Sequence, residues 1–119
     1  MIMKKMILMA VAMLSMSAAF AGNEDVKAVR KAYNMNVNYD RLAKVLNLTG
    51  DQYEAVEYFH DNFCNEMRRA SYASSEKRQA RFEKALRKDL SGMRSVLNRD
   101  QYRTYVMLLN VTLVNRGLK

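Results

Sequence analysis

Apolar residues recur along most of the chain at the period of an α-helix. Over about 50–72 they follow intervals of three and four residues, which place them on one face of a helix. The members of this stripe are Tyr53, Val56, Phe59, Phe63, Met67 and Ala70. Over about 76–97 the same spacing gives a narrower stripe, which consists of Phe82, Leu86, Leu90, Met93 and Leu97. Both segments are predicted to be long amphipathic helices.

Shorter segments extend the helical pattern on both sides. A helix is expected over 39–47, and a last helix, apolar on nearly all sides, over about 99–115. A helix of that kind is either central in a bundle or covered by a partner. For residues 22–38 two alternatives stay open, a weak helix over 24–33 or a poorly ordered segment. We therefore expect an all-α fold, a small antiparallel bundle or hairpin of about four helices.

Three positions bear on the helix ends and interiors. Ser74 is one of two serines that can cap the helix over 76–97. Gly117 is expected to cap the last helix at its carboxyl end. Gly92 lies inside the second long stripe without shifting its phase, which indicates a tolerated glycine or a mild kink.

Composition agrees with long helices and excludes several kinds of site. The 119 residues include no Pro, one Cys and one His. About 5% of an ordinary chain is Pro, so its absence favours unbroken helices. A single Cys excludes a disulfide within the chain, and a Cys₄ or Cys₂His₂ zinc site lacks ligands. The length fits one domain.

The first 21 residues have the pattern of a secretory signal peptide. Lys4 and Lys5 form a short basic region, and an apolar run follows over 6–20. Small residues at 19 and 21 make an A-x-A-type cleavage site before Gly22. We expect cleavage after Ala21, a single helical domain over 22–119, and a periplasmic or secreted location.

Two hexapeptides 49 residues apart share a helix-start pattern. They are Leu48-Thr49-Gly50-Asp51-Gln52-Tyr53 and Leu97-Asn98-Arg99-Asp100-Gln101-Tyr102. Thr49 and Asn98 are expected at helix N-caps, and Gln52 and Gln101, three residues later, complete capping boxes. We call Leu48, Thr49 and Gln52, together with Leu97, Asn98 and Gln101, the two helix-start motifs. Each is predicted to begin a helix.

Leu48-Thr49-x-x-Gln52 matches the LTxxQ signature, and the second copy matches it with Asn98 in place of Thr. With the signal peptide and the basic charge, the chain resembles the Spy/CpxP-like LTxxQ-motif periplasmic proteins. The resemblance implies a small helical protein, often an antiparallel dimer that forms a curved cradle. It also implies three candidate activities: ATP-independent chaperone, regulator of an envelope stress response, or metal sensor.

Little in the sequence points to catalysis. No Ser/His/Asp arrangement can be argued around His60, the only His, and no phosphate-binding glycine loop is present. We expect no enzyme activity and no cofactor. His60 and Cys64, four residues apart, are either two ligands of a shared metal in a dimer or an edge-of-core His beside a buried Cys. The Cys64 thiol is either packed in the core or paired with a second subunit; we expect the packed thiol.

Basic residues define the candidate binding surface. Lys and Arg number 20 against 12 Asp and Glu, a formal charge of +8. Four of them fall within about 60° on one helix face, opposite the apolar stripe. This cationic ridge consists of Lys77, Arg81, Lys84 and Lys88. Tyr58, on the polar side of its helix, is the further candidate for a partner contact.

These features favour an exported protein that binds unfolded or partner polypeptides without ATP. The ridge would attract acidic segments, and apolar patches would hold them. Two alternatives stay open: a structural or regulatory envelope protein with one specific partner, and a peripheral binder of anionic membrane. A homodimer is compatible with each. We expect no nucleic-acid partner, because the chain is exported.

Overall fold

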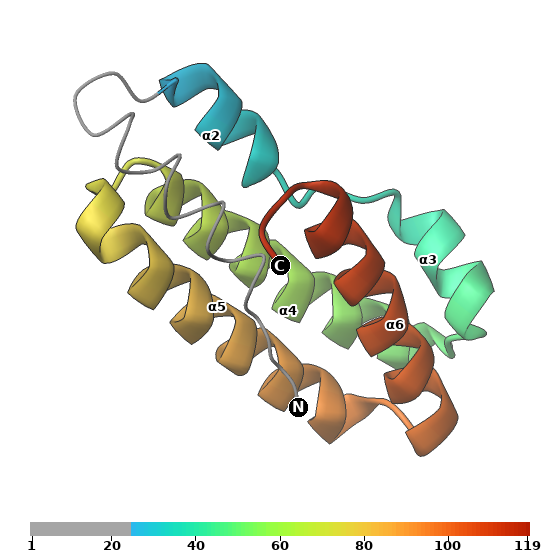
Figure 1. The fold of residues 1–119 in the computed structure, drawn as a ribbon. Helices are drawn as coiled ribbons and strands as arrows, with labels where there is room; N and C mark the ends of the chain where they lie inside the picture. The colour runs from blue at the N-terminus through green and yellow to red at the C-terminus, as the bar shows by residue number, and fades with distance from the viewer. Residues whose placement is uncertain (1–24) are drawn as a thin grey trace, which may run out of the picture.

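The computed structural model describes residues 25–119, which form five helices and no strand (Figure 1). The helices are α2 (Val26–Ala32), α3 (Tyr39–Leu46), α4 (Gly50–Ser71), α5 (Ser75–Val96) and α6 (Arg99–Asn115). The predicted all-α fold is confirmed. Of the alternatives for 22–38, the described part holds a short helix and a non-helical linker. The predicted signal peptide, 1–21, lies outside the described residues.

Helices α4 and α5 form an antiparallel hairpin closed by residues 72–74 (Figure 1). Gly92 of α5 faces Phe59 of α4. A β-carbon at position 92 would lie far inside van der Waals contact with the ring of Phe59. The expectation that Gly92 is merely tolerated is therefore wrong, because the missing side chain makes room for an aromatic ring between the two helices.

The core lies between this hairpin and the three other helices. Helices α2 and α3 pack against α4, while α6 contacts α5 and α3 (Figure 1). Met67 of α4, Met93 of α5 and Leu113 of α6 are fully buried. The linker after α2 contributes as well, because Tyr33 and Met35 are buried in the same cluster.

The helix ends follow the expected chemistry, with one exception. Gly117 adopts φ 74°, and the amide of Leu118 donates to the carbonyl of Leu113 at 2.9 Å, which closes α6 in a Schellman motif. Ser74 occupies the N-cap position of α5, but its side chain makes no capping hydrogen bond.

Helix α6 is not central in the molecule. Its buried face presents Leu109 and Leu113 to the core. On the opposite face, Met107, Val111 and Val114 are 56%, 53% and 58% exposed. We call these three residues the α6 apolar stripe. Of the two explanations for an all-round apolar helix, burial at the centre of a bundle is therefore wrong. Between residues 25 and 119, no helix has both the length and the apolar character needed to cross a membrane.

Candidate partner-binding surface

Both helix-start motifs form the expected capping boxes. Oγ1 of Thr49 accepts from the amide of Gln52 at 3.2 Å, and Oε1 of Gln52 accepts from the amide of Thr49 at 3.0 Å. The second motif repeats the arrangement between Asn98 and Gln101, at 2.8 and 2.9 Å. The motifs therefore begin α4 and α6. Leu97 is buried and Leu48 is half-buried against the core, beside the caps.

The two motifs also meet in space, which their sequence spacing does not indicate. Nε2 of Gln52 donates to Oε1 of Gln101 at 2.8 Å, and Nε2 of Gln101 donates back to Oε1 of Gln52 at 3.1 Å. Each amide also binds the end of a helix. Gln52 donates to the carbonyl of Val96 at 3.1 Å, and Gln101 to that of Leu46 at 3.1 Å. We call this arrangement the glutamine joint.

The glutamine joint satisfies every polar group of two amides. Each oxygen accepts from its own cap and from the other glutamine, and each NH₂ donates to a carbonyl and to the other glutamine. Val96 and Leu46 are the last residues of α5 and α3, whose carbonyls have no partner within their helices. The motifs are thus tertiary contacts as well as helix starts.

The cationic ridge of α5 is solvent-exposed along its whole length. Lys77, Arg81, Lys84 and Lys88 are all exposed. Nζ of Lys88 lies 3.9 Å from a carboxylate oxygen of Glu66, which places the ridge beside α4. This is the one ion pair of the ridge within residues 25–119, and at its length and exposure it contributes little to stability.

Tyr58 of α4 is exposed, as predicted. Its side chain is 63% accessible, and its ring packs edge-on against Phe59 with centroids 5.3 Å apart. Phe59 in turn fills the space above Gly92 of α5. Tyr58 is therefore an aromatic side chain held on a rigid support at the outer surface of the hairpin.

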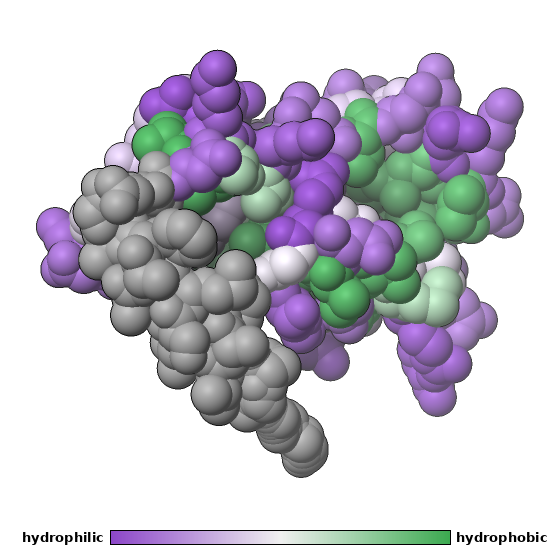
Figure 2. Space-filling model, turned by 45° about the horizontal axis from the view of Figure 1, so that its top comes forward, coloured by the Kyte–Doolittle hydropathy of each residue, from purple (hydrophilic) through white to green (hydrophobic). Residues whose placement is uncertain are grey.

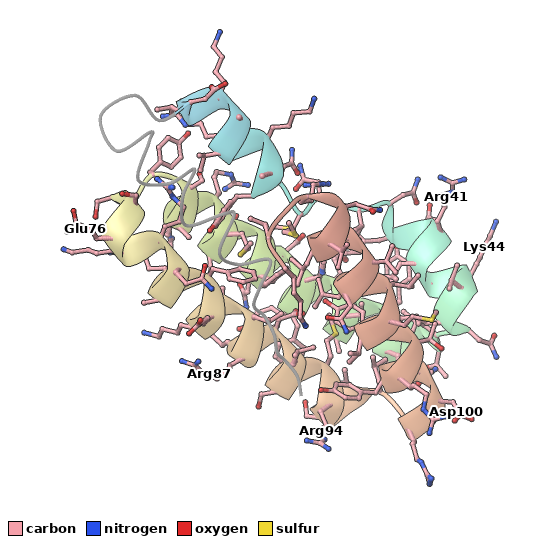
Figure 3. The ribbon with its side chains drawn as sticks, in the orientation of Figure 1. Arg41, Lys44, Glu76, Arg87, Arg94 and Asp100 are labelled. Carbon is pink, nitrogen blue, oxygen red and sulfur yellow. The ribbon has the colours of Figure 1, made fainter. Side chains whose placement is uncertain are left out.

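Apolar surface gathers elsewhere on the molecule. Figure 2 shows hydrophobic residues on the side formed by α3 and α6, bordered by hydrophilic ones. Exposed apolar side chains on these two helices are the α6 apolar stripe and Val45 of α3, which is 60% exposed. Arg41 and Lys44 project from α3 away from the helices, and Arg87 and Arg94 project from α5 (Figure 3). The surface thus combines exposed cations with exposed apolar side chains.

His60 lies in a buried polar chain that joins three helices and the linker. Its Nε2 is 2.8 Å from the carbonyl oxygen of Met35, and its Nδ1 is 3.1 Å from the hydroxyl of Tyr105. That hydroxyl is 2.5 Å from Oδ2 of Asp89 on α5. His60 is 3% exposed and so lies deeper than the core edge where the sequence placed it.

Every hydrogen bond of this chain is made when it holds one proton more than neutral His60 and ionised Asp89 supply. A carbonyl only accepts, so the proton of His60 is on Nε2 and Nδ1 accepts. The Tyr105 hydroxyl has one proton and cannot donate to both neighbours. Burial raises the pKa of Asp89 to about 7, and burial lowers the pKa of His60. A protonated Asp89 donates to Tyr105, which then donates to His60, and every link is made.

Cys64 is a packed thiol, as expected. It is 7% exposed, and its Sγ donates to the carbonyl of Met35 at 3.3 Å. Burial raises the pKa of this thiol to about 11, so it is not a thiolate at neutral pH. Within residues 25–119, no three His, Cys, Asp or Glu side chains are grouped to hold a metal ion.

Sequence analysis missed Asp89 and Tyr105 as partners of His60. A signal was present: Asp89 lies seven residues after Phe82 and four before Met93, on the apolar side of its helix. A charged residue at such a position needs a buried partner. The glutamine joint left no comparable signal, because a Gln at the third position of a helix is explained by capping alone.

Comparisons with known proteins give no match. No family model, no curated protein and no solved structure is significantly similar to the chain.

Proposed function

We propose that the protein is an exported helical binding protein that captures polypeptides without ATP, as a chaperone or in an envelope stress response. The proposal includes removal of residues 1–21 as a signal peptide and the LTxxQ-type kinship of the two helix-start motifs. The observation that carries it is the exposure of two complementary surfaces: the cationic ridge and the α6 apolar stripe.

The two surfaces have different tasks in this proposal. Four exposed cations on one helix face attract acidic segments and speed their encounter, an effect that salt weakens. The α6 apolar stripe and Tyr58 then retain the client by burying apolar surface. At about 25 cal/mol per Å², a contact of a few hundred Å² contributes several kcal/mol, and short-lived binding needs no more.

The test is suppression of client aggregation, measured by light scattering at low and high salt. We expect the protein to suppress aggregation of a reduced acidic client more strongly than that of a reduced basic client. Replacing Lys77, Arg81, Lys84 and Lys88 by Ser is expected to remove most of this preference. No suppression of either client contradicts the proposed function.

A matched variant separates the ridge from overall charge. Replacing Arg41, Lys44, Arg99 and Arg103 by Ser removes the same four charges from exposed positions outside the ridge. If this variant loses as much activity as the ridge variant, net charge rather than the ridge attracts the client. Capture of one stoichiometric partner favours a regulatory envelope protein, and salt-sensitive flotation with anionic vesicles favours a membrane binder.

A further inference from the structure

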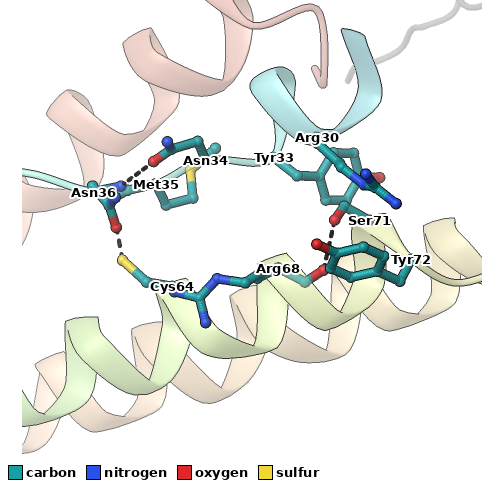
Figure 4. A pocket seen from close by; sticks show the side chains of 9 residues that line it. All are labelled: Arg30, Tyr33, Asn34, Met35, Asn36, Cys64, Arg68, Ser71 and Tyr72. Atoms are coloured by element: carbon teal, nitrogen blue, oxygen red, sulfur yellow. Dashed lines mark hydrogen bonds between the residues drawn. The ribbon is translucent and has the colours of Figure 1, made fainter. Parts of the chain in front are cut away.

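A cavity of about 170 Å³ opens between the linker after α2 and the second half of α4. Figure 4 shows linker residues along one side and α4 residues along the other. Binding sites for drug-sized ligands occupy roughly 300–1,000 Å³. This cavity therefore suits a small molecule or the end of a larger one.

Two guanidinium groups give the cavity a positive lining. Arg30 of α2 and Arg68 of α4 both border it, and none of its lining residues is acidic. Nη1 of Arg68 donates to the neutral amide oxygen of Asn65 at 2.9 Å. Among residues 25–119, no carboxylate lies within ion-pair distance of either guanidinium. Two guanidinium groups that line one cavity and have no carboxylate partner can bind an oxyanion.

The cations are held in place rather than free. The guanidinium of Arg30 lies over the ring of Tyr72, 4.3 Å from its centroid. The linker wall is held by Arg116, whose Nη1 donates to the carbonyls of Lys31, Ala32 and Asn34. Figure 4 shows Arg30 beside Tyr72 at one end of the cavity. Little side-chain ordering remains to be lost when an anion binds.

The neighbouring acids lie outside the cavity lining. Asp61 and Asp89 lie close enough to Cys64, which lines the cavity, for their charges to raise the pKa of its thiol. Asp61 accepts a hydrogen bond from the hydroxyl of Tyr39, and burial raises the pKa of Asp89 to about 7. Cys64 itself stays a thiol, because its pKa is raised to about 11. The lining itself therefore carries two guanidinium groups and no negatively charged side chain at neutral pH.

Apolar walls narrow the class of anion. Tyr33, Met35 and Tyr72 supply apolar atoms to the cavity wall, beside the neutral polar residues Asn34, Asn36 and Ser71. An inorganic phosphate would leave these apolar walls unmatched, whereas a carboxylate on an apolar stem matches both halves. We propose that the cavity between Arg30 and Arg68 binds the carboxylate of an acid with an apolar side chain, as found at the end of a polypeptide or in a small free acid.

This proposal shares no residue with the cationic ridge, so each can fail without the other. The test is titration of the protein with N-acetyl-leucine, its carboxamide and inorganic phosphate, followed by calorimetry or amide chemical shifts. We expect the free acid to bind at least tenfold more tightly than the carboxamide or phosphate. Equal binding of acid and amide, or tighter binding of phosphate, overturns the proposal.

Point variants locate the site. Arg30→Gln and Arg68→Gln are each expected to weaken binding of N-acetyl-leucine about tenfold. The matched control is Arg69→Gln, because Arg69 is next in sequence to Arg68 but pairs with Glu66 at 3.5 Å and does not line the cavity. An equal loss in Arg69→Gln would overturn the assignment. All three arginines are exposed, so these variants are expected to keep the wild-type melting temperature.

A second series identifies the source of the carboxylate. The probes are a pentapeptide ending in Leu with a free carboxyl group and 4-methylpentanoate, which has the same side chain but no peptide group. Tighter binding of the pentapeptide assigns the site to polypeptide ends, and tighter binding of 4-methylpentanoate assigns it to free acids. If both bind more weakly than the carboxamide, the proposal fails.

Discussion

The glutamine joint makes a prediction that separates its two roles. Gln101→Glu exchanges one NH₂ group for an oxygen and keeps the size of the side chain. A capping box accepts Glu as readily as Gln. If the motif only begins a helix, this substitution is neutral.

The structure predicts a large loss instead. The NH₂ group of Gln101 donates to the carbonyls of Leu46 and Asn47, at 3.1 and 3.3 Å, and to Oε1 of Gln52 at 3.1 Å. A carboxylate at this position faces three acceptors and donates to none. At about 1 kcal/mol for each lost hydrogen bond, the free energy of unfolding should fall by about 2–4 kcal/mol at pH 7. Gln101 is 9% exposed, so water compensates only in part.

The assay is urea unfolding followed by circular dichroism, at pH 7 and at pH 4.5. A protonated Glu at position 101 regains a donor, so its pKa in the folded state is raised. The folded protein then binds a proton that the unfolded chain releases, and the deficit relative to wild type should shrink as the pH falls. The mirror substitution, Gln52→Glu, should behave in the same way.

Gln79→Glu is the matched control. Gln79 is exposed on α5 and donates one hydrogen bond, to Glu83 at 3.1 Å. A new like-charge pair at this spacing should cost a few tenths of a kcal/mol. If Gln101→Glu costs no more than Gln79→Glu, the joint adds nothing to the caps, and the reasoning is refuted.

Three further predictions concern the core. Asp89→Asn should stabilise the protein at pH 8, by up to about 4 kcal/mol from a pKa raised from 3.8 to about 7. Between about pH 4 and 7, the folded wild type holds a proton on Asp89 that the unfolded chain has released. The free energy of unfolding of the wild type should therefore fall relative to that of Asp89→Asn as the pH rises through this range. Parallel pH profiles of the two proteins in urea unfolding would contradict this. Gly92→Ala should lower the melting temperature, because its β-carbon would collide with the ring of Phe59. Combining Gly92→Ala with Phe59→Leu should recover part of the loss. A melting temperature of Gly92→Ala at or above wild type would contradict the close contact. Cys64 should react with a thiol reagent far more slowly in the native protein than in denaturant, because it is only 7% exposed in the cavity wall and its pKa is raised to about 11. A native rate equal to the rate in denaturant would contradict this.

Much of the fold follows from local patterns in the sequence. Apolar spacing predicts the two long helices to within a residue or two at each end, and the caps at Thr49, Asn98 and Gly117 follow from short-range chemistry. Each of these features depends on residues within one or two helical turns. Such features are therefore visible without knowing how the helices pack.

The remaining features depend on packing between helices. Gly92 matches no local requirement, because its role depends on Phe59, which lies on another helix. The buried position of Asp89 is explained only by its hydrogen bond with the hydroxyl of Tyr105, which lies on α6. The cavity between Arg30 and Arg68 is likewise formed by two segments distant in sequence. Sequence periodicity assigns residues to faces but does not say which faces meet.

The glutamine joint has a consequence for exchange between chains. Its two halves offer the same donors and acceptors, so a half from a second molecule fits as well as the half from the same chain. Within one polypeptide, the α4–α5 hairpin and its connection at residues 72–74 favour the pairing by raising the local concentration of the partner half. The glutamine joint therefore also permits domain-swapped dimers, in which two chains exchange these segments without losing a hydrogen bond of the joint.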